Sequence, residues 1–176
     1  MRVLLIQPKM NKRPVDTDLK TRMAPSMALL TLAGLTPDCC EVVIVNENIE
    51  AVDYGQKPDL VGITVTVDVF PRAVQIARRF QSMGIPVVAG GIHITCCPGE
   101  CAPFFDAVCV GAAERVWSRI LEDARRGRLS KVYHDMEAFA GAEIISPAYG
   151  KIDKGKYLYT NVVSTSRGCP CRCDFC

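Results

Sequence analysis

The chain has 176 residues, with 21 Lys and Arg against 19 Asp and Glu, and it carries ten cysteines. A hydrophobic fraction of 49% and a charged fraction of 23% are ordinary for a globular domain and exclude a disordered chain. The net charge is +2, with no basic stripe and no acidic tail. We therefore expect neither a nucleic-acid surface nor a membrane anchor.

The amino terminus predicts a cytoplasmic protein. Its first apolar run covers only residues 3–6 and ends at Gln7 and Pro8. A secretory signal needs an apolar core of about 7–15 residues, and a membrane span needs about 20. In a reducing compartment, thiols stay free and serve as small apolar groups or metal ligands.

Short apolar runs bounded by turn residues recur along the first two thirds of the chain. Each is typical of a strand buried on both faces. These five predicted strands cover residues 3–6, 41–45, 60–67, 86–89 and 106–110.

Segments with helical spacing lie between these runs. Ser26 is a suitable cap for a helix that ends before Pro37. A second helix is predicted from Phe70 to Phe80, with Pro71 in its first turn and Gly84 after its end. A third covers residues 116–124, with Trp117 in its apolar stripe. Residues 48–55 give only weak support for a helix.

The alternation predicts an α/β fold with a doubly wound, mainly parallel five-stranded sheet in the flavodoxin-like or Rossmann-like order 2-1-3-4-5. Ligands of such sheets bind at the carboxyl ends of the strands. The sequence thus singles out four loops, at residues 7–13, 64–68, 90–95 and 111–114.

The pattern changes after residue 130. Residues 131–134 suggest a short edge strand, residues 136–157 are predicted to be a linker, and residues 158–164 are predicted to be a new strand. We expect a first domain over residues 1–135, the linker, and a truncated start of a second domain over residues 158–176.

Four of the ten cysteines stand in the last eight residues. Cys169, Cys173 and Cys176 have CxxxCxxC spacing, which lets three thiolates hold a cubane cluster and leaves one iron open for a ligand. Arg167 favours the thiolate forms. With Cys171 included, a four-thiolate zinc site is the alternative.

Residues 165–176 (TSRGCPCRCDFC) resemble the cluster loop of the radical S-adenosylmethionine (radical SAM) barrel. The resemblance implies a [4Fe-4S] cluster on Cys169, Cys173 and Cys176, S-adenosylmethionine on the fourth iron, and a reductant such as ferredoxin or flavodoxin.

Residues 59–63, 87–93 and 107–114 resemble the cobalamin-binding domain that precedes this barrel in one large subgroup. The resemblance implies a cofactor site lined by Thr64, Thr66, Gly90, Gly91, His93 and Glu114. Three features depart from the family: the DxHxxG motif is absent after the first strand, Ala112 replaces an acidic residue, and no barrel follows residue 176.

The family implies an enzyme of radical methyl transfer or rearrangement at an unactivated carbon, with cobalamin as a further cofactor. Because the barrel is missing, we expect the 176-residue chain to be inactive alone, and no catalytic residue is assigned. The alternatives are a stand-alone cobalamin-binding module with a vestigial cysteine tail, or an interaction protein with a zinc tail.

Each candidate residue also has a purely structural interpretation. The two glycines suit any tight turn, the threonines are ordinary strand formers, and Glu114 suits the start of a helix. Trp117 is expected in the core. The remaining cysteines are predicted to be structural or incidental, namely Cys39, Cys40, Cys96, Cys97, Cys101 and Cys109.

Overall fold

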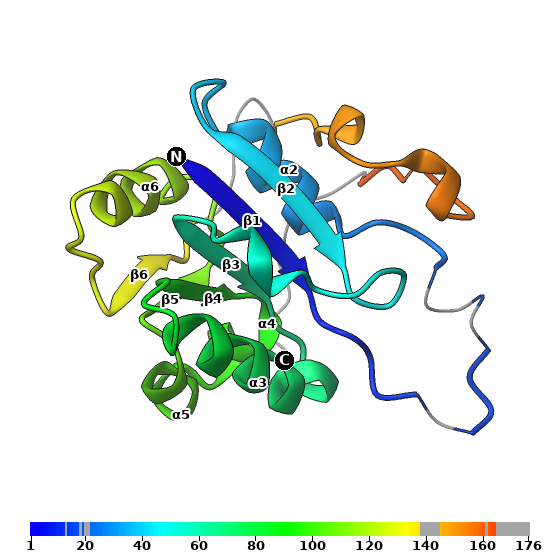
Figure 1. The fold of residues 1–176 in the computed structure, drawn as a ribbon, viewed down its shortest axis with the longest axis horizontal. Helices are drawn as coiled ribbons and strands as arrows, with labels where there is room; N and C mark the ends of the chain where they lie inside the picture. Colours follow the sequence, from blue (N-terminus) through cyan, green and yellow to red (C-terminus); the bar gives the residue numbers. More distant parts are fainter. Residues whose placement is uncertain (13, 18, 20–21, 138–144, 161, 165–176) are drawn as a thin grey trace.

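A six-stranded parallel sheet runs through the part of the chain that the structure describes. The computed structural model describes residues 1–12, 14–17, 19, 22–137, 145–160 and 162–164. The strand order is β2-β1-β3-β4-β5-β6, and each neighbouring pair is parallel (Figure 1). The strands are β1 (Arg2–Gln7), β2 (Glu41–Asn46), β3 (Leu60–Thr64), β4 (Val87–Gly90), β5 (Ala107–Gly111) and β6 (Val132–Asp135).

The α/β class and the order 2-1-3-4-5 are confirmed, but the predicted strand number is corrected from five to six. The sixth strand, β6, pairs with β5, with Val132 beside Val108. The sequence suggested it only as a short edge strand at residues 131–134, outside the five-stranded sheet. Its residues alternate between exposed and buried, so it lacks the continuous apolar run that marks the central strands.

The predicted helices form close to their expected bounds, and shorter helical turns join them. The α-helices among the described residues are α2 (Met27–Leu35), α3 (Phe70–Gln81), α4 (Ile92–Cys96), α5 (Pro98–Cys101) and α6 (Trp117–Arg125). In the same described segments, the 3-10 turns are η1 (Tyr54–Gln56), η2 (Val67–Val69), η3 (Ala102–Phe104), η5 (Tyr149–Lys151) and η6 (Lys154–Lys156).

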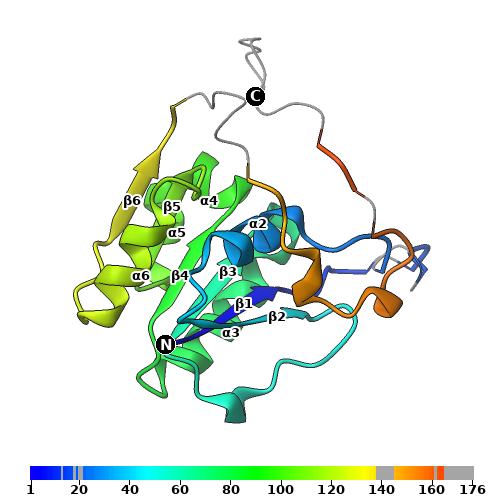
Figure 2. The same ribbon diagram turned by 90° about the horizontal axis from the view of Figure 1, so that it is seen from above.

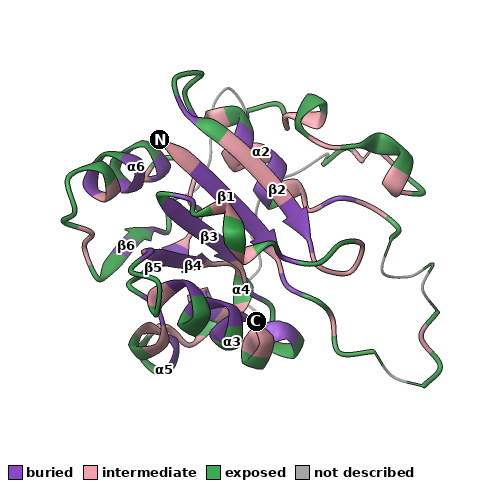
Figure 3. Ribbon diagram, viewed as in Figure 1, coloured by how far each residue is buried: buried purple, intermediate pink, exposed green. Residues whose placement is uncertain are grey.

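Helices cover both faces of the sheet, α3 on one and α2 with α6 on the other (Figure 2). On the first face, Phe80 of α3 packs in one cluster with Ile6 of β1. On the second, Trp117 of α6 packs with Leu5 of β1, and its indole Nε1 donates to the Thr36 hydroxyl at 2.9 Å. Trp117 is therefore in the core, as expected. Burial follows the layers, with the outer strands more exposed than the central ones (Figure 3).

Helix α2 has no polar face, since its sequence is MALLTLAGL. A helix that is apolar all round must be covered on both sides. Residues 145–151 supply the outer cover: the Ala148 N–H donates to the Leu30 carbonyl at 3.0 Å, and a Cβ on Gly34 would lie 3.1 Å from the Ser146 carbonyl oxygen. The expected domain boundaries stay a prediction, and part of the expected linker is packed against this helix.

The strand predicted at residues 158–164 is wrong for the residues that the structure describes there, which are not in a strand. The Leu158 and Tyr159 N–H groups donate to the carbonyls of Arg22 and Met23, so this segment pairs with a loop and not with a sheet. No start of a barrel is seen among the described residues, and the cysteine motif from Cys169 lies outside them. None of the described helices is both long and apolar enough to cross a membrane.

Candidate functional site

A pocket lies between helix α2 and the carboxyl ends of β3, β4 and β5. It encloses about 130 Å³. Three of the four loops singled out from the sequence contribute to it. Small and apolar residues dominate its lining, which consists of Ala28, Leu29, Leu32, Gly62, Ile63, Thr64, Val88, Gly90, Gly91, Cys109, Gly111, Ala112, Ala113 and Glu114.

Two glycines with positive φ let the backbone segments around the pocket approach one another. Gly91 has a φ of 105°, and a Cβ there would lie 2.7 Å from the Val65 carbonyl oxygen. Gly111 has a φ of 85°, and its Cβ would lie 1.9 Å from the Asp135 carbonyl oxygen. No side chain fits at either position without moving backbone, so both glycines are required by the geometry.

Thr95 of α4 joins the loops after β4 and β5. Its hydroxyl donates to the Gly91 carbonyl at 3.0 Å and accepts from the Gly111 N–H at 3.0 Å. The Val65 N–H also donates to the Gly90 carbonyl at 2.8 Å. These hydrogen bonds fix the loops after β3, β4 and β5 relative to one another.

The structure brings four of the six predicted cofactor-site residues together and separates two. Thr64, Gly90, Gly91 and Glu114 line the pocket. Thr66 is exposed and bonds to the Asp68 carboxylate at 2.5 Å. His93 packs edge-on against Phe70 of α3, with ring centroids 4.8 Å apart. The role of all six as ligand contacts stays a prediction.

Several pocket residues were missed from the sequence. Leu29 and Leu32 of α2 line the pocket, but the sequence singled out neither, because an apolar helix gives no sign of which side faces a cavity. Cys109 was expected to be structural. Burial, followed by the charges of Asp135 and Glu114, raises its pKa to about 12, so its thiol is neutral at physiological pH.

Two buried acceptor atoms flank the pocket without a hydrogen-bond partner among the described residues. They are Gln7 Oε1 at the end of β1 and Asp135 Oδ2 at the end of β6. Strand alternation places both side chains on the sheet face that α2 and α6 cover, because Leu5 and Tyr133, two residues earlier, pack there. An unsatisfied buried acceptor is costly, so such atoms call for a donor.

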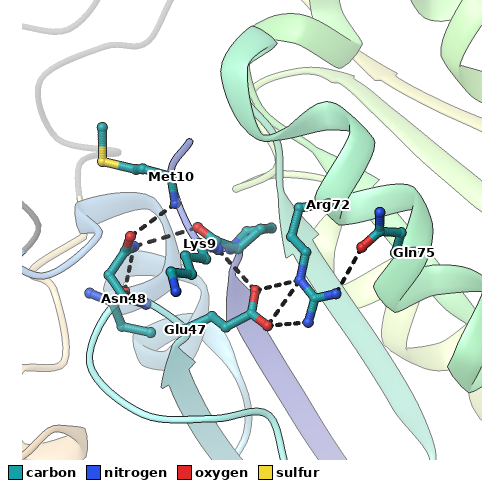
Figure 4. A network of polar contacts seen from close by, with 8 residues as sticks. Lys9, Met10, Glu47, Asn48, Arg72 and Gln75 are labelled. Carbon is teal, nitrogen blue, oxygen red and sulfur yellow. Dashed lines mark hydrogen bonds and ion pairs between the residues drawn. The ribbon is translucent and has the colours of Figure 1, made fainter. Parts of the chain in front are cut away.

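The fourth loop, after β1, does not line this pocket and carries a polar network (Figure 4). The Glu47 carboxylate accepts from the Lys9 N–H at 3.0 Å and from the Arg72 Nε, which is 3.0 Å from each oxygen. The Met10 N–H donates to Asn48 Oδ1 at 2.9 Å, and Arg72 Nη1 donates to Gln75 Oε1 at 2.9 Å.

The network shifts the pKa values of Glu47 and Arg72, which form its ion pair. Burial would raise the pKa of Glu47, but the hydrogen bonds from Arg72 and the Lys9 N–H outweigh burial, and the pKa is lowered. The hydrogen bond to Glu47 raises the pKa of Arg72. Both groups are therefore charged at neutral pH, and the start of this loop is tied down between β2 and α3.

The fold and the pocket together define a doubly wound α/β domain with a pocket at the carboxyl edge of its sheet, which is where such folds bind ligands. No protein-family model matches the chain. Three curated relatives do match it, and all of them are methyltransferases by name.

The chain is 34% identical over 171 residues to a bacteriochlorophyllide d C-8(2)-methyltransferase of Chlorobaculum tepidum, covering 92% of this chain and 38% of the relative. It is 28% identical to an uncharacterised methyltransferase of Pyrococcus horikoshii, covering 100% of this chain and 45% of the relative. It is also 28% identical to a bacteriochlorophyllide d C-12(1)-methyltransferase of C. tepidum, covering 67% and 27%. The chain thus spans less than half the length of each of these relatives.

These comparisons contradict the expected family, function and cofactors. The relatives are methyltransferases, and nothing in their names points to cobalamin, an iron–sulfur cluster or radical chemistry. The described residues also hold no group of three or more His, Cys, Asp or Glu that could bind a metal. The assignment as a cobalamin-binding radical SAM protein is therefore corrected to a relationship with methyltransferases, and the two alternatives gain no support. The expected ligands Cys169, Cys173 and Cys176 lie outside the described residues.

Proposed function

We propose that the protein is a methyltransferase that uses S-adenosylmethionine, and that its pocket binds a ring-bearing ligand of the methyl transfer. The observation that carries the proposal is the 34% identity to a named methyltransferase across 92% of this chain. The six-stranded parallel sheet agrees with a Rossmann-like domain, in which ligands bind at the carboxyl ends of the strands.

The size and lining of the pocket favour one ring-sized part of a ligand. A cavity of about 130 Å³ is smaller than a site for a whole cofactor, which typically measures about 300–1,000 Å³. Its glycines and alanines expose flat apolar surface, and Gly90 allows backbone approach. Thr64 and Glu114 add polar groups, which suits a flat ring with a polar edge.

The described lining residues can bind and orient a ligand, and none of them is an activated nucleophile. The thiol that lines it, Cys109, is neutral and therefore a poor nucleophile. Methyl transfer between two bound molecules gains its rate chiefly from holding the reacting atoms in line. We propose that Thr64, Gly90, Gly91 and Glu114 contact the ligand, and that the free acceptors of Gln7 and Asp135 accept from its polar groups.

Two sources can supply such a ring: the adenosyl group of S-adenosylmethionine, or an acceptor of the kind that the relatives' names give. The test titrates the chain with S-adenosylhomocysteine in one arm and with bacteriochlorophyllide d in the other. The chain has a single Trp, Trp117, and a Cβ on the pocket residue Gly62 would lie 3.8 Å from its ring. Its fluorescence reports on the pocket floor.

A matched pair of variants locates the binding. Gly90→Leu fills the pocket without a backbone clash, since a Cβ there would meet Cys109 at 3.7 Å. Gly99→Leu adds the same bulk where nothing lies within 4 Å. We expect one probe to bind the parent chain and the Gly99 variant, with binding lost in the Gly90 variant. Binding that survives Gly90→Leu, or no binding of either probe, would contradict the pocket assignment.

We also propose that the partners of the protein are small molecules and that it works in the cytoplasm. The compartment is supported by the six described cysteines, all of which are free thiols. Measuring the cell fraction that holds the native protein tests it.

A further inference from the structure

Two adjacent cysteines and an arginine meet at the edge of the sheet opposite to the pocket. Cys39 and Cys40 directly precede β2, and Arg125 stands at the end of α6. Arg125 Nη2 lies 3.4 Å from the Cys39 sulfur and 2.9 Å from the Cys40 sulfur. The sequence alone predicted only structural roles for both cysteines.

The two sulfurs differ in access to solvent. Cys39 is exposed, whereas Cys40 is buried at 4% exposure. A reagent in solution therefore reaches Cys39, while Cys40 is covered. Both sulfurs share one guanidinium, so the buried thiol also helps to position the arginine beside the exposed one.

Arg125 supplies a permanent positive charge to this pair. A cationic donor favours the thiolate over the thiol, and the thiolate is the nucleophile. The hydrogen bond from Arg125, followed by the one from Cys40, lowers the pKa of Cys39. Cys109 provides the contrast within the same fold, because burial raises its pKa.

We propose that Cys39 is a modification site whose thiolate, held by Arg125, reacts with small disulfides such as oxidised glutathione. The Cys39 sulfur attacks one sulfur of the disulfide and forms a new S–S bond. The old S–S bond breaks, and the second half leaves as a thiolate that takes a proton from water. The Cys39 sulfur is oxidised and the leaving sulfur is reduced, so no other oxidant is needed.

The chain contains controls for both exposure and charge. Cys96 is exposed, and no described arginine or lysine bonds its sulfur, so it shows the rate of an exposed thiol without the cation. Cys40 has the same arginine but is buried. Arg126, the next residue of the helix segment, pairs with Glu122 and provides a matched charge removal.

The experiment treats the folded chain with oxidised glutathione and measures the initial rate at each cysteine by mass spectrometry with fragmentation. The gain in thiolate outweighs its lower intrinsic nucleophilicity, so we expect Cys39 to react roughly threefold or more faster than Cys96. Arg125→Gln should bring the Cys39 rate down to that of Cys96. Arg126→Gln should leave it unchanged, and Cys40 should stay unmodified in the folded protein.

Equal rates at Cys39 and Cys96 in the parent chain would overturn the proposal. So would a Cys39 rate that Arg125→Gln leaves unchanged. A far-ultraviolet circular dichroism spectrum of each variant checks the fold, and Arg125→Lys, which keeps the charge, should retain most of the rate. Because the pair lies away from the pocket, this outcome is independent of the ligand titrations.

Discussion

The two halves of the carboxyl edge of the sheet are built in opposite ways. After β3, β4 and β5, the chain uses glycine, alanine and threonine, and a cavity of about 130 Å³ remains. After β1 and β2, long polar side chains bond to one another and to α3 through Glu47 and Arg72 (Figure 4). The edge is the same, but a pocket lies at one half and a polar network ties the other to α3.

The difference shows that the size of the side chains at a strand end decides whether a pocket can form there. Both halves flank the point between β1 and β3 where the strand order reverses, which is the expected place for a ligand. Small residues with positive φ keep the backbone close and the space free on the pocket side. On the other side the Glu47 carboxylate takes the donors that a ligand would otherwise need.

The largest effect is expected at Gly111, on the half with the pocket. In Gly111→Ala the new Cβ would meet the Asp135 carbonyl oxygen at 1.9 Å, so β5 and β6 must move apart. We expect a loss of roughly 3 kcal/mol or more in the free energy of unfolding, because strain at a positive φ adds to overpacking. Urea unfolding followed by Trp117 fluorescence measures it.

Gly127→Ala is the matched control for this substitution. Gly127 also has a positive φ, 63°, but nothing lies within 4 Å of its Cβ position. It should lose only about 1 kcal/mol, the usual cost of a left-handed alanine. Equal losses in the two variants would show that the close approach at Gly111 is unimportant.

A smaller effect is expected from Arg72→Met, which removes the ion pair from the polar network. The Glu47 side chain is 9% exposed and would keep a charge without its partner. We expect a loss of about 1–3 kcal/mol, the cost of an unpaired, largely buried carboxylate. Arg126→Met breaks an exposed pair between the last turn of α6 and the residue after it, and should cost at most about 0.5 kcal/mol. A result as small for Arg72 would mean that solvent satisfies Glu47.

The smallest effect is a change in the dependence of stability on pH. The pKa of Glu47 is lowered in the folded chain from its ordinary value of 4.5. Its contribution to stability is therefore fully present above that value, and it is lost as the pH falls through the lower folded pKa. Glu47→Gln should flatten the decline of the urea midpoint between about pH 5 and pH 3. The exposed Glu122→Gln should keep the parent decline, and equal slopes in all three proteins would contradict the assignment.

Most of the fold could be predicted from short stretches of sequence, because each central strand and helix has its own hydrophobic pattern. The strands are continuous apolar runs, and α3 has a regular stripe that ends in Phe80. The strands show continuous runs because both of their faces are buried, and α3 shows a stripe because only one of its faces is buried. Strand β6 was not counted because an edge strand with only alternate residues buried leaves a weaker pattern.

The site was predicted only in part because its geometry depends on distant residues. Glycines near strand ends pointed to Gly90 and Gly91, which line the pocket. Thr66 and His93 stand close to them in sequence but point elsewhere, to Asp68 and Phe70. The pair of Glu47 and Arg72 joins two elements 25 residues apart, and neither residue alone signals the other.

The size of the pocket also depends on residues that do not line it, through helix α2. The helix lines the cavity with Leu29 and Leu32, and its opposite side is in close contact with residues 146–148 at Gly34. A larger residue at position 34 could be accommodated only by displacing that segment outward or the helix inward. Gly34 and residues 146–148 would then have to change size together, and the volume of the cavity could be adjusted without altering any residue that lines it.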